Sequence, residues 1–226
     1  MQCIEVKTAT EAFEHWFKVL NSQNLGAASR DGGVKGEVLN AVTVITDPTR
    51  GIIQSNIRKM PMRYAVGELM WYLSGNPTLD AIRNYTSAWD RMSDDGVTVN
   101  SNYGWCIKYK YGFDQWEYVK DLLRKDINSR QAVLHIKTAE DKPSKDVNCT
   151  VCLQFLIRDG KLHTTVYMRS NDIWTGFPYD VFAFTAFQCK MAMELGVGIG
   201  TYTHIAGSLH LYERNGMDGE DTNQSV

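Results

Sequence analysis

The sequence lacks an excess of basic residues. Its 24 Lys and Arg residues are set against 26 Asp and Glu residues, which gives a formal net charge of −2 over 226 residues. Proteins that bind a nucleic-acid backbone usually carry a basic excess, so no nucleic-acid polymer is expected as a partner. Hydrophobic residues make up 43% and charged residues 22% of the chain. This balance is that of a globular domain and excludes a disordered chain, a collagen and a coiled coil.

The sequence also lacks a long apolar run. The most apolar stretch, residues 181–193, is interrupted by Thr185, Gln188 and Lys190 and is too short and too polar to span a bilayer. The first five residues lack the basic and apolar regions of a signal peptide. We therefore expect no membrane partner and a cytoplasmic protein.

Cysteine is scarce and unevenly spaced. Five cysteines are an odd number, which indicates free thiols in a reducing compartment. Cys149 and Cys152 form a CxxC pair, but no second pair completes a zinc site, and strand residues three apart point to opposite faces. No metal site is expected. Cys149 follows a polar loop, where it is either a nucleophile or a buried, inert thiol.

The chain shows no repeat and no linker, which predicts a single domain over residues 1–226. Helical spacing predicts a helix that starts with a capping box at Thr8 and continues through Leu20, and further helices over 62–74, 113–125 and 179–195. Strands are predicted over 37–46, 132–137 and 202–212, and Asp159-Gly160 predicts a tight hairpin between 150–158 and 161–168. Residues 21–35, 85–104 and 140–148 are predicted to be loops. This order indicates an α+β fold.

A few polar residues stand out from this framework. Glu68 lies in the otherwise apolar stretch 65–73, where a buried carboxylate needs a partner or a catalytic role. Arg169 and Ser170 end the hairpin and form either a solvated strand end or an anion site. His204 and His210 are expected on one face of the last strand, where a structural role and a functional role both stay open.

Six motifs combine these residues in one order: Glu68-Leu69-Met70-Trp71-Tyr72-Leu73, Asn102-Tyr103-Gly104-Trp105, Cys149-x4-Gln154-Phe155, Arg169-Ser170-x-Asp172, Gly176-Phe177-Pro178 and Gly207-x2-His210-x-Tyr212. The pattern resembles the thymidylate synthase family over residues 8–214. The resemblance implies a large mixed β-sheet flanked by helices and a homodimer that packs sheet to sheet. It also implies 5,10-methylenetetrahydrofolate as cofactor and a pyrimidine nucleoside monophosphate as substrate.

Two departures from the family pattern indicate a branch. Thymidylate synthases usually read Pro-Cys-His at the nucleophile, whereas this chain reads Asn148-Cys149-Thr150, and Asp180 stands where they carry Asn. Both features resemble the viral deoxycytidylate hydroxymethylases. The chemistry agrees: once a thiolate adds to C6 of cytosine, N3 gains a proton, and a carboxylate accepts hydrogen bonds from both resulting N–H groups. The alternative is that Asp180 only caps the following helix.

The implied reaction is transfer of a one-carbon unit to C5 of dCMP through an adduct between the Cys149 thiolate and C6. Addition of water then gives 5-hydroxymethyl-dCMP and tetrahydrofolate. C5 methylation, or reaction on dUMP or CMP, is the alternative. The sequence after Tyr212 ends in the polar residues 218–226 and lacks the apolar closing segment of thymidylate synthases. This difference favours addition of water over reduction by hydride. If the protein is viral, it is expected in the host cytoplasm.

The resemblance also implies roles for single residues. Glu68 organises water and proton transfers, Tyr103 supports proton removal, and Arg169 lowers the pKa of the Cys149 thiol. The phosphate is held by Gln154, Arg169 and Ser170, by Arg130 of the other subunit, and by a loop cation that is either Arg30 or Lys35. The sugar is bound by His210 and Tyr212, and the pterin by Trp89 and Asp172. A non-catalytic nucleotide- or RNA-binding relative is expected to lack Cys149, Glu68 or Asp180, yet all three are present.

Overall fold

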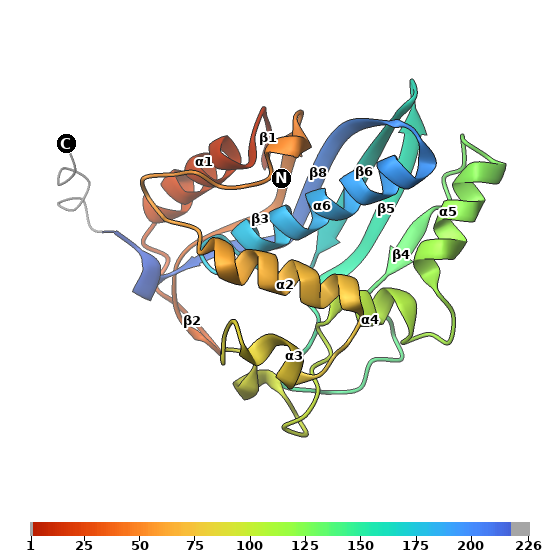
Figure 1. The fold of residues 1–226 in the computed structure, drawn as a ribbon. Helices are drawn as coiled ribbons and strands as arrows, with labels where there is room; N and C mark the ends of the chain where they lie inside the picture. The colour runs from red at the N-terminus through yellow and green to blue at the C-terminus, as the bar shows by residue number, and fades with distance from the viewer. Residues whose placement is uncertain (1, 218–226) are drawn as a thin grey trace.

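The computed structural model describes residues 2–217 and is built around one mixed β-sheet (Figure 1). The polar segment 218–226, on which the expectation of a missing closing segment rests, lies outside the described residues. The main strands follow the order β1 (Gln2–Val6), β3 (Gly32–Ile45), β8 (Gly198–Tyr212), β6 (Lys161–Met168), β5 (Thr150–Arg158) and β4 (Val133–His135). Strands β2 (Ala27–Ser29) and β7 (Asn171–Asp172) join β3 and β8 respectively. The predicted mixed sheet of an α+β fold is confirmed.

Both strand orientations occur next to the long strand β8. It runs antiparallel to β3 and parallel to β6 and β7, while β5 pairs antiparallel with β6. The turn between β5 and β6 has positive φ at both Asp159 (51°) and Gly160 (70°), which is the backbone of a type I′ hairpin. The predicted hairpin is therefore confirmed at the same two residues.

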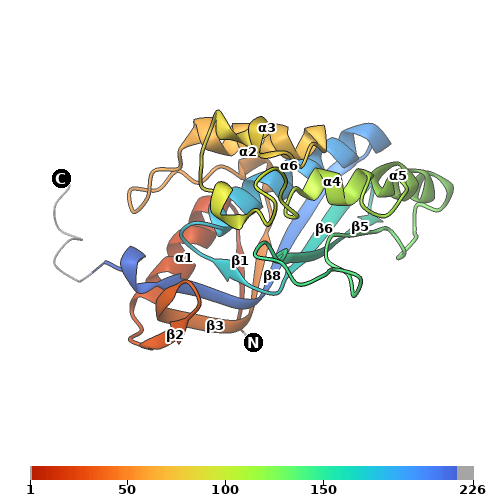
Figure 2. The same ribbon diagram turned by 90° about the horizontal axis from the view of Figure 1, so that it is seen from below.

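The described helices lie over one face of the sheet, as Figure 2 shows. They are α1 (Ala9–Asn21), α2 (Met62–Ser74), α3 (Leu79–Arg83), α4 (Tyr103–Lys108), α5 (Gln115–Lys125) and α6 (Phe177–Leu195). Helix α1 begins as predicted, because the Thr8 side chain accepts a hydrogen bond from the Glu11 backbone N–H. The Glu11 carboxylate accepts from the backbone N–H of Lys7, one residue before the position that a strict capping box uses.

Three predicted boundaries are wrong. The expected loop 21–35 contains β2 and the start of β3, since residues 27–29 pair with residues 32–34 in a small hairpin. The expected loop 85–104 ends inside α4, whose N-cap Asn102 accepts a hydrogen bond from the Trp105 backbone N–H. Strand β8 starts at Gly198 rather than at residue 202, because pairing with β6 extends it. The start of β8 depends on a strand that is distant in sequence, whereas the β2–β3 hairpin and the Asn102 cap are contacts between residues close in sequence.

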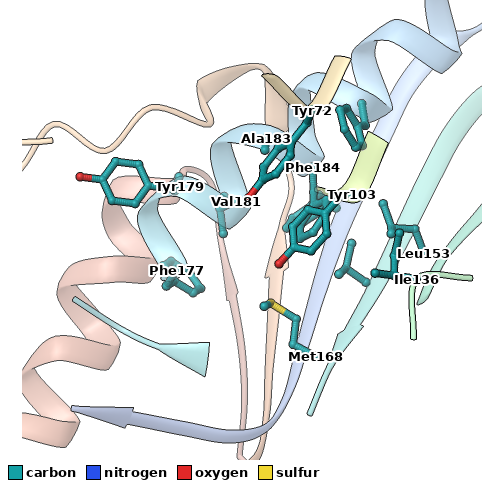
Figure 3. Close-up of a cluster of buried hydrophobic side chains, with 14 of the residues drawn as sticks. Tyr72, Tyr103, Ile136, Leu153, Met168, Phe177, Tyr179, Val181, Ala183 and Phe184 are labelled. Atoms are coloured by element: carbon teal, nitrogen blue, oxygen red, sulfur yellow. The ribbon is translucent and has the colours of Figure 1, made fainter. Parts of the chain in front are cut away.

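An aromatic stack joins the helices that surround the later site. The rings of Tyr72, Tyr103 and Phe184 stack in sequence, with centroid separations of 4.7 and 5.3 Å, and come from α2, α4 and α6 (Figure 3). Gly104 allows this close approach, because a Cβ atom there would lie 1.5 Å from the Tyr72 carbonyl oxygen. The stack fixes where the Tyr103 side chain lies.

None of the described helices is both long and apolar enough to cross a membrane.

We predict that Gly104→Ala strongly destabilises the protein, by about 3 kcal/mol, because the methyl group would push α4 away from the backbone of α2. Gly198→Ala is the matched control, since its Cβ atom would be no closer than 3.2 Å to the flexible Lys161 side chain. Urea unfolding of both variants measures the difference. Equal midpoints for the two variants would contradict the close-packing argument.

Candidate active site

The polar residues singled out by the sequence gather around one cavity of about 1070 Å³. Helices α2, α4 and α6 supply part of its wall, and β7, the end of β8 and the segment before β5 supply another part. The β2–β3 turn, the segment before α2 and residues 85–92 complete it. Ten of the twelve expected site residues line this cavity: Glu68, Trp89, Tyr103, Cys149, Arg169, Ser170, Asp172, Asp180, His210 and Tyr212. The fold therefore brings together segments that span most of the chain.

Cys149 lies immediately before β5, next to the end of β6. The backbone N–H of Arg169 donates to the Cys149 carbonyl, and Arg169 Nη2 lies 3.7 Å from the Cys149 sulfur. Burial raises the pKa of the thiol, while the nearby Arg169 charge acts to lower it. Arg169 therefore acts on the thiol pKa in the expected direction, but the pKa is raised overall because loss of water around the sulfur outweighs the attraction of the cation.

Glu68 is almost completely removed from water, at 5% exposure, and faces the cavity. The Tyr64 hydroxyl, one helical turn earlier on α2, donates to its carboxylate at 2.5 Å. Burial raises the pKa of Glu68 to about 8, although this hydrogen bond acts to lower it. Glu68 can therefore hold or release a proton near neutral pH, which is the property required of a general acid or base.

Asp180 lies in the first turn of α6, yet its carboxylate does not cap the helix. The N-cap residue is Gly176, and no side chain accepts a hydrogen bond from this terminus. Instead the Asp180 carboxylate accepts from Asn171 Nδ2 at 2.8 Å and from the Tyr103 hydroxyl at 3.4 Å. Burial raises its pKa to about 7. The alternative that Asp180 only caps the helix is thus wrong, and Asp180 is a titratable residue that lines the cavity.

Basic groups lie at another part of the wall. Of the two loop cations that the sequence left open, Arg30 lines the cavity and Lys35 does not. The Arg169 guanidinium donates to the carbonyls of Val147 and Asn148, so its orientation is fixed by the backbone. With Ser170 alongside, these side chains can bind an anion such as a phosphate.

The remaining wall residues are held in several ways. His210 and Tyr212 pack edge to face with centroids 4.9 Å apart at the end of β8. Asp172 accepts from the Trp174 backbone N–H at 2.9 Å and from the Thr175 hydroxyl, so it also shapes the turn before α6. Trp89 packs on Trp71 with a centroid separation of 5.4 Å.

Gln154 and Arg130 do not line the cavity. On β5 the buried Leu153, Phe155 and Ile157 point toward the helices, so the alternation of the strand directs Gln154 to the opposite face. There Gln154 Nε2 donates to the Arg130 carbonyl at 2.9 Å. The phosphate contact expected of Gln154 is therefore wrong for this cavity, and the expected role of Arg130 at a partner's cavity stays a prediction.

The sequence did not single out Arg58, although it lines the cavity. Its guanidinium lies 5.5 and 5.2 Å from the ring centroids of Trp174 and Tyr179, and one nitrogen donates to the Tyr179 hydroxyl. The other terminal nitrogen, Nη1, is buried without a hydrogen-bond partner. No motif around Arg58 signals this role, because its partners lie more than 100 residues away. Tyr64 and Asn171 were likewise given no site role, although their partners Glu68 and Asp180 lie only four and nine residues away in the sequence.

The fold and the cavity define an α+β protein with a thiol, the carboxyl groups of Glu68 and Asp180 and a cationic patch around one ligand-sized space. A family model described as thymidylate synthase matches residues 27–221. The chain belongs to the thymidylate synthase family.

Two known proteins show the extent of the similarity. The chain is 32% identical to a deoxyuridylate hydroxymethyltransferase of Bacillus phage SP01 over 164 residues, which cover 66% of this chain but only 43% of that protein. The crystal structure of thymidylate synthase from T4 phage matches with a TM-score of 0.75 and 22% identity. That match covers 89% of this chain and 76% of the T4 chain, and it shows a shared fold.

The two raised carboxyl pKa values predict how stability depends on pH. The folded state binds protons more strongly than the unfolded state between about pH 4, where unfolded carboxyls titrate, and pH 7 to 8. The free energy of unfolding contributed by these groups is therefore present at low pH and lost as pH rises through this window. The free energy of unfolding of Asp180→Asn minus that of the wild type should therefore rise by about 2 kcal/mol from pH 5 to pH 8, because the variant has no carboxyl group to ionise there.

The measurement is the urea midpoint of each protein at pH 5 and at pH 8. Asp95→Asn is the control, because hydrogen bonds from the Thr98 and Val97 backbone keep the pKa of Asp95 below its usual range. Asp95 is then ionised at both pH values, and its replacement should change stability equally at both. The same pH-independent shift for Asp180→Asn would refute the buried-carboxyl interpretation.

Proposed function

We propose that this protein is a dCMP 5-hydroxymethyltransferase that uses 5,10-methylenetetrahydrofolate. The observation that carries the proposal is the position of Asp180, whose carboxyl group faces the same cavity as Cys149 and Glu68. The family membership supports pyrimidine C5 chemistry, and the phage relative is named a hydroxymethyltransferase. The choice of cytosine rests on Asp180.

Asp180 suits the hydrogen-bonding edge of cytosine. Cytosine presents an unprotonated N3 and an N4 amino donor, so a protonated carboxyl group can donate to N3 and accept from the amino group. When the Cys149 thiolate adds to C6, electrons move toward N3, which then takes the proton from Asp180. The resulting carboxylate accepts two N–H donors and stabilises the adduct more than the free base. A pKa of about 7 keeps this proton available near neutral pH.

Glu68 is placed for the later proton transfers. Its carboxyl group is held by Tyr64 and exposed to the cavity, and Tyr103 lies against Asp180 on the same side. We assign to Glu68 the positioning and deprotonation of the water that adds to the exocyclic carbon at C5. Tyr103 assists removal of the C5 proton. Arg169, Ser170 and Arg30 hold the phosphate, and His210 with Tyr212 holds the sugar hydroxyl.

The cavity also fits the folate. When bound, 5,10-methylenetetrahydrofolate supplies the one-carbon unit. The cavity wall includes the aromatic side chains of Trp89 and Tyr179, and Arg58, which also lines the cavity, has a buried N–H group without a protein partner. Flat rings pack on such surfaces, and an anionic or carbonyl group satisfies such a donor. Trp89 and Asp172 are the residues that we assign to the pterin.

Hydroxymethylation of dUMP is the second candidate, because the phage relative carries that substrate in its name. A neutral Asp180 offers one donor and one acceptor, as an Asn side chain does, and so can also match uracil. C5 methylation and a CMP substrate are the remaining alternatives, which the mass of the product distinguishes.

We predict that the wild type, incubated with methylenetetrahydrofolate, converts dCMP to a product heavier by a hydroxymethyl group. Asp180→Asn should lower kcat/KM for dCMP by about a hundredfold and raise the relative use of dUMP, because the amide cannot give a proton to N3. Mass spectrometry of products from dCMP, dUMP and CMP makes the measurement. Product from dUMP alone would overturn the cytosine assignment, and a methyl product would overturn hydration.

We further propose a homodimer in which the face of the sheet opposite the helices packs on the same face of a second copy. Tyr167, which alternates with the core-facing Val166 and Met168 on β6, is 38% exposed there. Arg130 lies next to this face through its bond with Gln154 and reaches the phosphate of the partner. Free thiols suit a reducing cytoplasm, where we place the enzyme.

A mixing experiment tests the shared site. Cys149→Ser should be inactive and Arg130→Ala strongly impaired, but mixed dimers contain one site with both residues intact. Unfolding and refolding the two variants together should restore about a quarter of wild-type activity, because half the dimers are mixed and each has one complete site. Cys152→Ser, whose thiol lies outside the cavity, is the control and should stay active. No recovery in mixtures of confirmed dimers would place Arg130 outside the partner's site.

A further inference from the structure

A chain of buried polar side chains ends on Asp180. The Asp180 carboxylate is bonded to Asn171 Nδ2 at 2.8 Å, and Asn171 Oδ1 lies 3.0 Å from His204 Nε2. His204 Nδ1 in turn lies 2.9 Å from the Tyr202 hydroxyl. Asn171, His204 and Tyr202 are between 0 and 3% exposed. Asn171 lines the cavity, whereas His204 and Tyr202 do not. The sequence motifs assign none of these three residues a function.

The chain has one direction. An ionised carboxylate only accepts hydrogen bonds, so Asn171 must turn its amide nitrogen to Asp180 and its oxygen to His204. His204 then has to carry its proton on Nε2, and its bare Nδ1 accepts from the Tyr202 hydroxyl. Burial lowers the pKa of His204 to about 3, so the ring is neutral and has a single N–H to give. Each group in the chain thus fixes the orientation of the next.

The direction of the chain makes the two Asp180 oxygens different. Oδ2 is the oxygen that accepts from Asn171, whereas Oδ1 is near only the Tyr103 hydroxyl, at 3.4 Å. Because the N–H of Asn171 points at Oδ2, a proton on Asp180 is placed on Oδ1. The carboxyl group therefore presents one reserved acceptor and one oxygen that can donate.

This difference bears on the choice between the two bases. Cytosine needs a donor opposite N3 and an acceptor opposite its C4 substituent, whereas uracil needs the reverse. A carboxyl group free to place its proton on either oxygen would satisfy both bases equally. A site that fixes the proton on one oxygen satisfies only one of them.

We propose that Asn171, His204 and Tyr202 are positioning residues that reserve Asp180 Oδ2 as the acceptor for the cytosine amino group and thereby select dCMP over dUMP. This inference rests on the proposed function. It adds that selectivity resides in the buried chain behind Asp180 as well as in the Asp itself.

The test compares two replacements of His204. His204→Leu removes the N–H group that donates to Asn171. The Asn171 amide can then turn over, so that its oxygen accepts a hydrogen bond from a protonated Oδ2. The ratio of kcat/KM for dCMP to that for dUMP should then fall by about tenfold or more, the factor that one lost hydrogen bond of about 1.4 kcal/mol produces. His204→Gln keeps a donor at the position of Nε2 and should hold the ratio within about threefold of the wild type.

Gln188→Met is the control for simple loss of stability. Gln188 is fully buried on α6, the helix whose first turn carries Asp180, but its amide donates to the backbone carbonyls of Leu162 and Thr201. This variant should be less stable with an unchanged ratio. A ratio that falls equally in Gln188→Met and His204→Leu would overturn the inference.

A second measurement is independent of activity. Nitrogen-15 NMR of the histidine side chains, of which the chain has five, should show a neutral His204 protonated at Nε2. Protonation at Nδ1 would overturn the chain whatever the substrate is. If the wild type converts only dUMP, the proposed function fails; if it prefers dCMP and His204→Leu keeps that preference, the inference alone fails.

Discussion

The carboxyl groups of Glu68 and Asp180 face the same cavity as the Cys149 thiol, and burial raises the pKa of both. The architecture of the site follows from the hydrogen bonds that these two groups need. A buried carboxylate is costly unless hydrogen bonds replace its water. Glu68 receives a bond from Tyr64 on its own helix, whereas Asp180 receives bonds from Asn171 on β7 and Tyr103 on α4. The support of Asp180 therefore requires that three separate elements hold fixed positions relative to one another.

Close packing provides those positions. The Tyr72, Tyr103 and Phe184 rings tie α2, α4 and α6 together, and Gly104 allows the backbones of α2 and α4 to approach. Behind the site, β8 pairs with β3, β6 and β7, so the segment that carries His210 is held along its length. Packed helices and paired strands thus hold the part of the cavity wall that carries Glu68, Tyr103, Asp180 and His210.

The sequence predicted what local patterns encode. The Asp159-Gly160 turn, helix α2 and the Thr8 cap follow from residues that are neighbours in the chain, and the family resemblance identified ten cavity residues. The expected role of Gln154 shows what local patterns cannot determine. Alternation in the sequence separates the two faces of β5, but only the helices that pack on the sheet decide which face is buried. The raised pKa of Cys149 likewise depends on burial, which no motif encodes. The Asn171–His204–Tyr202 chain joins the two-residue strand β7 to β8, and its link between residues 171 and 204 corresponds to no sequence motif.

The spacing of Asp180 and Phe184 on α6 has a consequence for thermal motion. The two residues are four positions apart, so one helical turn carries both the group that faces the base and the ring that seats Tyr103. A small slide or rotation of α6 carries both along together. The contact between Asp180 and Tyr103 therefore depends on the position of α6 through both residues, and on α2 through Tyr72, which stacks on the same Tyr103 ring.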